Sequence, residues 1–102
     1  MEIKLTACPR KDKRISTPGL QGLEYRQQAA LCRDLKHADA HFVDYVLKPA
    51  TDEMWNLIDG KRSIGDIVEF SLLEFNLRTD ASLWIPVFVG WQKAGLITIT
   101  SG

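Results

Sequence analysis

The sequence has few cysteines, no excess of charge and no long apolar run. Its two cysteines, Cys8 and Cys32, form no Cys-x-x-Cys pair, which excludes a zinc ribbon and a thioredoxin-type site. Thirteen Lys and Arg balance thirteen Asp and Glu, so no net positive charge is available for general binding to nucleic acid phosphates. No apolar run approaches the roughly 20 residues that span a bilayer, and Met1–Lys4 lacks a signal-peptide core. We therefore expect a cytoplasmic protein.

Motifs for catalysis and metal binding are also missing. Cys32, His37 and His41 are close in sequence, but their spacing matches no regular zinc pattern and a fourth ligand is lacking. There is no glycine-rich phosphate loop, no Gly-x-Ser-x-Gly, and no nucleophile motif around either cysteine. We therefore predict no catalytic residues, no metal site, no cofactor and no enzymatic activity.

What the chain does contain is one small domain with an uneven distribution of charge. Its 102 residues suffice for a single domain, and 45% hydrophobic with 25% charged residues is ordinary for one. Residues 1–18 carry five basic side chains against two acidic ones and are interrupted by Pro9 and Pro18. We expect this segment to be an irregular basic arm with at most a short strand at Ile3–Ala7, and residues 19–102 to form the domain. The arm is either solvated or in contact with an acidic partner.

The middle of the chain allows two interpretations. Residues Leu20–Ala38 alternate apolar and polar side chains in places, as a half-buried strand does, yet they can also be written as one amphipathic helix. The segment Phe42–Leu47 has the β-branched and aromatic content of a strand, which Pro49 would end.

After Pro49 the pattern predicts three helices and a final strand. The first helix begins near Pro49–Thr51 and stops at Asp59-Gly60. Ser63 caps the second helix, with Asp66 three residues on. The third helix runs from about Ala81 to Ala94 and is closed by Gly95, and residues 96–99 form a strand.

The third helix has two apolar stripes, which is one more than a surface helix needs. At about 100° per residue, Ile85 and Val89, with Gln92, lie nearly opposite the larger stripe. The larger stripe comprises Trp84, Val87, Phe88, Trp91 and Ala94. The second stripe is either covered by a sheet or the N-terminal segment, or left open for a partner. Pro86 removes a backbone donor, so we expect a kink or an irregular first turn there.

The segment LKPATDEMWNLIDG followed by KRSIGDIVEF resembles the PqqD-like family of small peptide-recognition proteins. The resemblance covers about Val43 to Ile97, and Lys48, Pro86 and Gly90 depart from the family pattern. The matching positions are Leu47, Met54, Leu57, Asp59, Gly60, Arg62, Ser63, Ile64, Ile67 and Val68, with the ending Lys93-Ala94-Gly95-Leu96-Ile97.

The resemblance implies an α+β, winged-helix-like domain in which an N-terminal three-stranded antiparallel sheet precedes a three-helix bundle. The expected strands are Leu23–Gln28, Leu31–His37 and Phe42–Leu47, which favours a hairpin over a helix in the ambiguous segment. Family members bind the leader segment of a ribosomally made precursor peptide and present it to a modifying enzyme, often a radical S-adenosylmethionine enzyme. The leader adds as a strand beside the third strand and is walled by the third helix.

On this basis we expect a non-catalytic peptide-binding chaperone or adaptor. The candidate peptide-binding residues are Phe42, Val43, Asp44, Tyr45 and Val46 on the edge strand, and Ile85, Val89 and Gln92 on the third helix. A homodimer through the edge strand would compete for the same surface. The alternative is a winged-helix DNA-binding regulator. Lys93 is the only cation between Asp80 and Gly95, however, and one cation supplies few of the phosphate contacts that a recognition helix needs.

Overall fold

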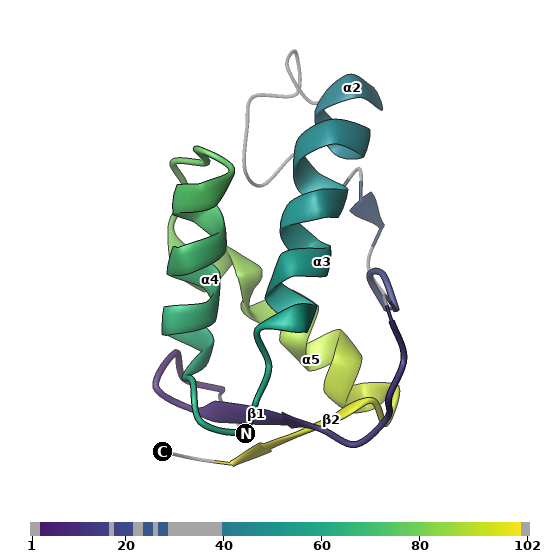
Figure 1. Ribbon diagram of the computed structural model, residues 1–102, viewed down its shortest axis with the longest axis vertical. Helices are drawn as coiled ribbons and strands as arrows, with labels where there is room; N and C mark the ends of the chain where they lie inside the picture. The colour runs from purple at the N-terminus through teal and green to yellow at the C-terminus, as the bar shows by residue number, and fades with distance from the viewer. Residues whose placement is uncertain (1–2, 17, 22–23, 26, 29–39, 101–102) are drawn as a thin grey trace.

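The computed structural model describes residues 3–16, 18–21, 24–25, 27–28 and 40–100, and these form an α+β fold. Helices α3, α4 and α5 pack around one core, and a two-stranded antiparallel sheet crosses one end of them (Figure 1). In chain order the elements are β1 (Cys8–Lys11), α2 (Ala40–Phe42), η2 (Val43–Leu47), α3 (Lys48–Asn56), α4 (Ile64–Glu74), η3 (Ala81–Trp84), α5 (Ile85–Lys93) and β2 (Ile97–Thr100).

The expected strand Phe42–Leu47 is wrong, because this segment is helical. The elements α2, η2 and α3 follow one another without a break from Ala40 to Asn56. A helix places Phe42, Val43, Val46 and Leu47 on one side, and all four lie in the core or pack against it. Burial of this helical face outweighs the strand propensity of the individual side chains, which depends strongly on context.

Pro49 explains why the helix widens at η2. Proline has no N–H, and its ring collides with the carbonyl four residues earlier in a regular α-helix. Over Val43–Leu47 the bonding shifts to the wider π pattern, in which the Lys48 N–H donates to the Val43 carbonyl. Pro49 then stands in the first turn of α3, directly after the widened turn.

The N-terminal three-stranded sheet is likewise not what the described residues form. Tyr25, Gln27 and Gln28, in the expected strand Leu23–Gln28, are helical, and the Gln28 N–H donates to the Glu24 carbonyl at 3.1 Å. The expected strand Leu31–His37 lies outside the described residues. The sheet that does form joins the two ends of the chain, pairing β1 antiparallel with β2. Its partner β2 confirms the final strand expected around residues 96–99.

The basic arm forms one strand, which lies at Cys8–Lys11 rather than at the expected Ile3–Ala7, and its other described residues form no helix or strand. Beyond β1 the described residues up to Gln21 run along the helices, where two buried tryptophans hold them; below, the N-terminal arm means residues 3–16 and 18–21. The Trp55 Nε1 donates to the Ile15 carbonyl and the Trp91 Nε1 donates to the Gly19 carbonyl, both at 2.7 Å. Two indole donors inside the core therefore find their acceptors on the arm's backbone.

The turn and capping residues predicted for the helical half of the chain are confirmed. Gly60 has φ +79° just past α3, and the Ser63 hydroxyl accepts the Asp66 N–H at 3.1 Å at the start of α4. The irregular turn expected at Pro86 is the single 3₁₀ turn η3, after which α5 begins with proline in its first turn. Gly95, with φ +76°, ends the last helix.

Candidate functional site

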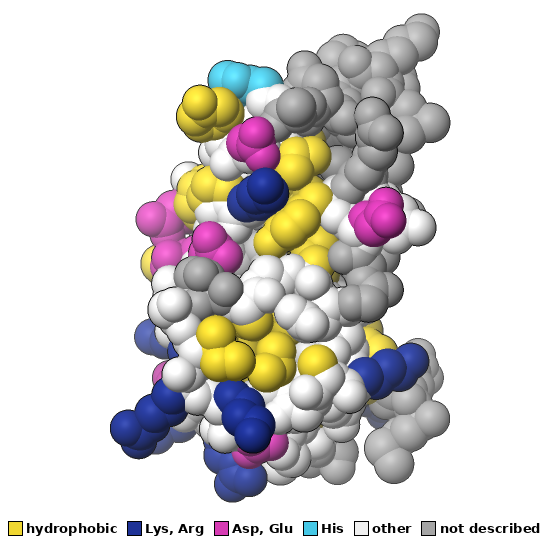
Figure 2. Space-filling model, turned by 90° about the vertical axis from the view of Figure 1, so that its right-hand side faces the viewer, with side chains coloured by type: hydrophobic (Ala, Val, Ile, Leu, Met, Phe, Trp, Pro, Cys, Tyr) yellow, Lys and Arg dark blue, Asp and Glu magenta, His cyan; other side chains and the backbone are white. Residues whose placement is uncertain are grey.

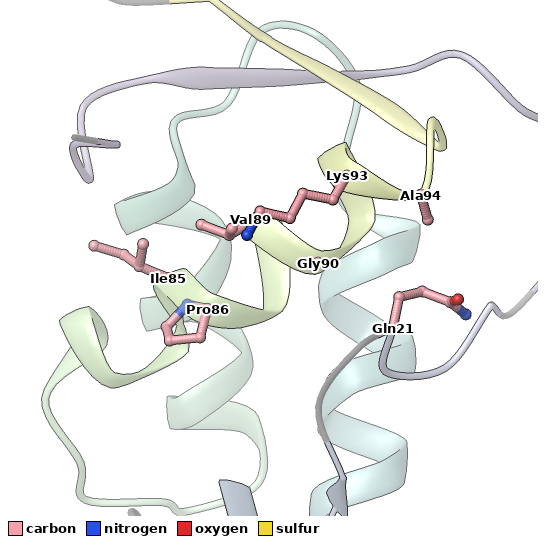
Figure 3. Close-up of a pocket in the computed structure, with 7 residues that line it drawn as sticks. All are labelled: Gln21, Ile85, Pro86, Val89, Gly90, Lys93 and Ala94. Atoms are coloured by element: carbon pink, nitrogen blue, oxygen red, sulfur yellow. The ribbon is translucent and has the colours of Figure 1, made fainter. Parts of the chain in front are cut away.

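A groove of about 500 Å³ runs along the outer side of α5 (Figure 3). Its lining comes almost entirely from α5, together with one residue of the N-terminal arm. The lining residues are Gln21, Ile85, Pro86, Val89, Gly90, Lys93 and Ala94.

The groove exists because α5 buries only one of its two apolar stripes. Trp84, Val87, Phe88 and Trp91 are essentially fully buried, and Trp91 makes edge contacts with the rings of Phe88 and Trp55 at 5.1 and 5.3 Å. Ile85 and Val89 on the other side are half-buried. Of the two outcomes that the sequence left open for this stripe, the described residues therefore leave it partly uncovered.

Gly90 sets the second wall of the groove. A Cβ at this position would stand 2.1 Å from the Gln21 carbonyl oxygen, well inside van der Waals contact. Only glycine therefore lets the arm cross α5 this closely. The Trp91–Gly19 hydrogen bond, one residue further along the helix, holds the same crossing in place.

Among the lining residues that the structure describes, Lys93 carries the only charged side chain. It belongs to the last turn of α5, and its side chain runs back along the helix toward Val89 (Figure 3). The groove thus offers an apolar floor with one ammonium group. Gln92, expected to be the polar group of this site, is exposed and does not line the groove.

The residues expected on the edge strand lie elsewhere. Phe42 and Val46 line a separate cavity of about 420 Å³ with residues 75–79, so the groove and these two residues do not meet in one cleft. Val43 is half-buried against the core. Asp44 is exposed and pairs with Lys48 at 3.1 Å, while Tyr45 is 68% exposed and stacks on His41 with 4.6 Å between ring centroids.

Titratable groups cluster only weakly in the described part of the chain. Partial burial raises the pKa of Tyr25, with a further upward contribution from Asp52. Burial also raises the pKa of Asp52, while nearby Lys48 opposes that shift. The Lys48 Nζ lies 5.5 Å from the Tyr25 ring centre, so this cluster ties residue 25 to α3.

The described residues contain no group of three His, Cys, Asp or Glu side chains placed to hold a metal ion. None of their helices combines the length and the apolar character that crossing a bilayer requires.

Sequence reasoning found Ile85 and Val89 of this groove but missed most of the other lining residues. Pro86 and Gly90 are unusual residues for the third helix, and they were the sequence signal that could have pointed to this helix face as part of a site. Gln21 gave no sign, because its place depends on how the arm crosses α5. Comparisons of the chain with models of protein families, with curated proteins and with solved structures give no match.

Proposed function

We propose that this protein is a non-catalytic peptide-binding module that takes a segment of another polypeptide into the α5 groove. The observation that carries the proposal is the partly uncovered stripe of Ile85 and Val89 beside Gly90. An apolar, open site whose described lining carries a single charge suits a peptide's side chains better than a small polar substrate.

The resemblance to the PqqD-like family makes this proposal more specific. It suggests that the peptide is the leader segment of a ribosomally made precursor, and that the module presents it to a modifying enzyme. The Asp-Gly-Lys-Arg-Ser-Ile turn supports the resemblance at the local level, since Asp59 accepts the Lys61 and Arg62 N–H groups at 2.9 Å and Ser63 caps α4. The helical state of Phe42–Leu47 removes the edge strand on which the family mechanism relies, so we assign binding to the groove itself.

The DNA-binding alternative gains nothing from the geometry of α5. Lys93 is the only cation on this helix, and five of its side chains besides that of Pro86 are apolar. A recognition helix needs polar groups for base edges and flanking phosphate contacts.

The test begins by selecting ligands for the whole chain from a library of displayed random peptides and measuring the affinity of an enriched peptide by fluorescence polarisation. Where a neighbouring gene encodes a short precursor, its leader and core halves are measured separately, and the leader half is expected to bind. We expect the double variant Ile85→Ala, Val89→Ala to bind about tenfold more weakly or worse. Each buried methylene contributes about 0.8 kcal/mol, and about 1.4 kcal/mol corresponds to a tenfold change.

The matched control is Leu73→Ala, which removes an apolar side chain that is 82% exposed on α4. It should leave the affinity unchanged. Unaltered binding by a folded Ile85→Ala, Val89→Ala variant would show that the groove is not the site.

A further inference from the structure

The helix α4 has two apolar sides, and only one of them is buried. Figure 1 shows α4 at one edge of the molecule, with α3 and α5 on its inner side. Phe70 and Leu73 lie on the outer side and are 55% and 82% exposed. The other large hydrophobic residues that are exposed in the described chain, Ile15 and Tyr45, lie on the arm and on η2. The buried side of α4 consists of Ile64, Ile67, Val68, Ser71 and Leu72.

Glutamates border the exposed pair on both sides. At about 100° per residue, Phe70 and Leu73 stand about 60° apart around the helix axis. Glu69 lies about 40° beyond Leu73, and Glu74 lies about 40° beyond Phe70. Asp66 continues the stripe one turn earlier, and all three acidic side chains are exposed. We call this surface, formed by Asp66, Glu69, Phe70, Leu73 and Glu74, the α4 outer face.

The acidic side chains of the α4 outer face are not neutralised within the described chain. None of them forms an ion pair with a described residue, and α4 contains no Lys or Arg. Asp66 stands in the first turn of α4, where the helix dipole favours a negative charge. Glu74 is the last residue of α4, where the dipole disfavours one. The position of Glu74 therefore costs the fold stability, which a cation brought by a partner would return.

The opposite side of the molecule does not have this arrangement. Figure 2 shows the side that lies away from α4 in Figure 1, and there Lys and Arg as well as Asp and Glu lie among the apolar side chains. A surface of mixed charge does not select a partner by the sign of its charge. The α4 outer face carries charge of one sign around an apolar centre, so it selects both for sign and for an apolar stripe.

We infer that the α4 outer face binds a basic amphipathic helix of a second protein. Phe70 and Leu73 would form half of the apolar seam between the two helices, as a and d residues do in a coiled coil. The glutamates occupy the flanking positions, where Lys or Arg of the partner would pair with them. The partner is a helix because the N–H and C=O groups of α4 are bonded within α4. An extended segment would find no main-chain partners on this surface.

Two properties of the surface bear on the choice of partner. A second copy of α4 is a poor occupant, because it would set glutamates against glutamates. The surface is also separate from the α5 groove, since no residue of α4 lines that groove. The inference thus goes beyond the proposed function: a peptide along α5 and a second protein against α4 would not compete.

The test measures binding of designed helical probes to the whole chain by fluorescence polarisation at low salt. The Lys probe is a fluorescent peptide of about 20 residues with Leu at the a and d positions of a heptad repeat and Lys at the e and g positions. The Glu probe carries Glu in place of Lys. A third probe has the composition of the Lys probe in an order without an apolar stripe. We expect only the Lys probe to bind, and added salt to weaken its complex.

Removal of the exposed pair tests the apolar seam. Phe70→Ala with Leu73→Ala should weaken binding of the Lys probe about tenfold or more. Both residues are exposed, so the variant should fold as the parent does. The matched control is Ile85→Ala with Val89→Ala, which removes a pair of apolar side chains from the α5 groove and should leave binding of the Lys probe unchanged.

Reversal of the flanking charges tests the preference for a basic partner. Glu69→Lys with Glu74→Lys should weaken binding of the Lys probe and make the Glu probe the better ligand. The matched control is Glu24→Lys with Asp44→Lys, which changes the net charge equally at two exposed positions outside α4. In that control the Lys probe should remain the better ligand.

Several results would overturn the inference. They are no binding of the Lys probe, equal binding of all three probes, or unchanged affinity of a folded Phe70→Ala, Leu73→Ala variant. A dimer of the parent in light scattering that this variant abolishes would also overturn it, because a second copy would then cover the face. Loss of Lys-probe binding only in Ile85→Ala, Val89→Ala would place the probe in the α5 groove, which overturns this inference and leaves the proposed function standing.

Discussion

Replacing Gly90 by alanine tests the close crossing of the arm over α5. In an exposed helix this change stabilises by about 1 kcal/mol, because alanine is the better helix former. Here the added Cβ would stand 2.1 Å from the Gln21 carbonyl oxygen and 3.2 Å from the Gln21 carbonyl carbon. The obstacle is backbone, so the arm itself must move away by about 1 Å to reach van der Waals distance.

The cost of that movement follows from what the arm is bonded to. Overpacking of this kind costs about 1–3 kcal/mol. Withdrawal of the arm also stretches the 2.7 Å bond from Trp91 Nε1 to the Gly19 carbonyl, and a buried donor left without an acceptor costs about 1–3 kcal/mol. Against the helix gain of about 1 kcal/mol, the net destabilisation should be at least about 1 kcal/mol.

Urea and thermal unfolding followed by circular dichroism measure this difference. For a domain of this size, 1 kcal/mol shifts Tm by about 4–8 °C. A double-mutant cycle with Trp91→Phe tests whether Gly90→Ala acts through the Trp91–Gly19 hydrogen bond, because a bond already lost in Gly90→Ala cannot be lost again. We expect a coupling energy of about 1 kcal/mol, while the control Gln92→Ala, at an exposed position of α5, shows none. A Gly90→Ala protein as stable as the parent or more so would refute the close crossing.

Two further predictions concern the turn between α3 and α4. Ser63→Ala removes the acceptor of the Asp66 N–H and should lower the free energy of unfolding by about 1 kcal/mol. Ser63→Asp keeps an acceptor and should therefore keep most of the parent's stability. Equal losses of stability in the two variants, measured by urea unfolding, would exclude capping as the reason. Hydrogen bonds from the backbone N–H groups of Arg62 and Lys61 lower the pKa of Asp59. A lowered folded-state pKa stabilises at pH values above the unfolded-state pKa and stops doing so as pH falls through the folded-state value. The Tm gap between the parent and Asp59→Ala should thus be constant from pH 7 to about 5 and shrink in more acidic buffer; a gap that widens there would contradict the assignment.

Much of the helical half follows from short stretches of sequence. Gly60 takes a positive φ, Ser63 offers a hydroxyl to α4, and Pro86 begins α5, and each of these effects is confined to one turn of chain. The sequence pattern therefore predicts these boundaries well. It also separates the two stripes of α5, since helical spacing alone determines which residues share a face.

Tertiary structure decided what local propensity could not. Phe42–Leu47 suits a strand by composition, yet as a helix it buries four apolar side chains on one side at once, and that larger gain in burial prevails. The arm looks solvated because it is polar, but buried indole groups of Trp55 and Trp91 need its carbonyls as acceptors. The groove and the β1–β2 sheet depend on where this arm crosses α5 and pairs with β2, so they arise from contacts between residues far apart in sequence.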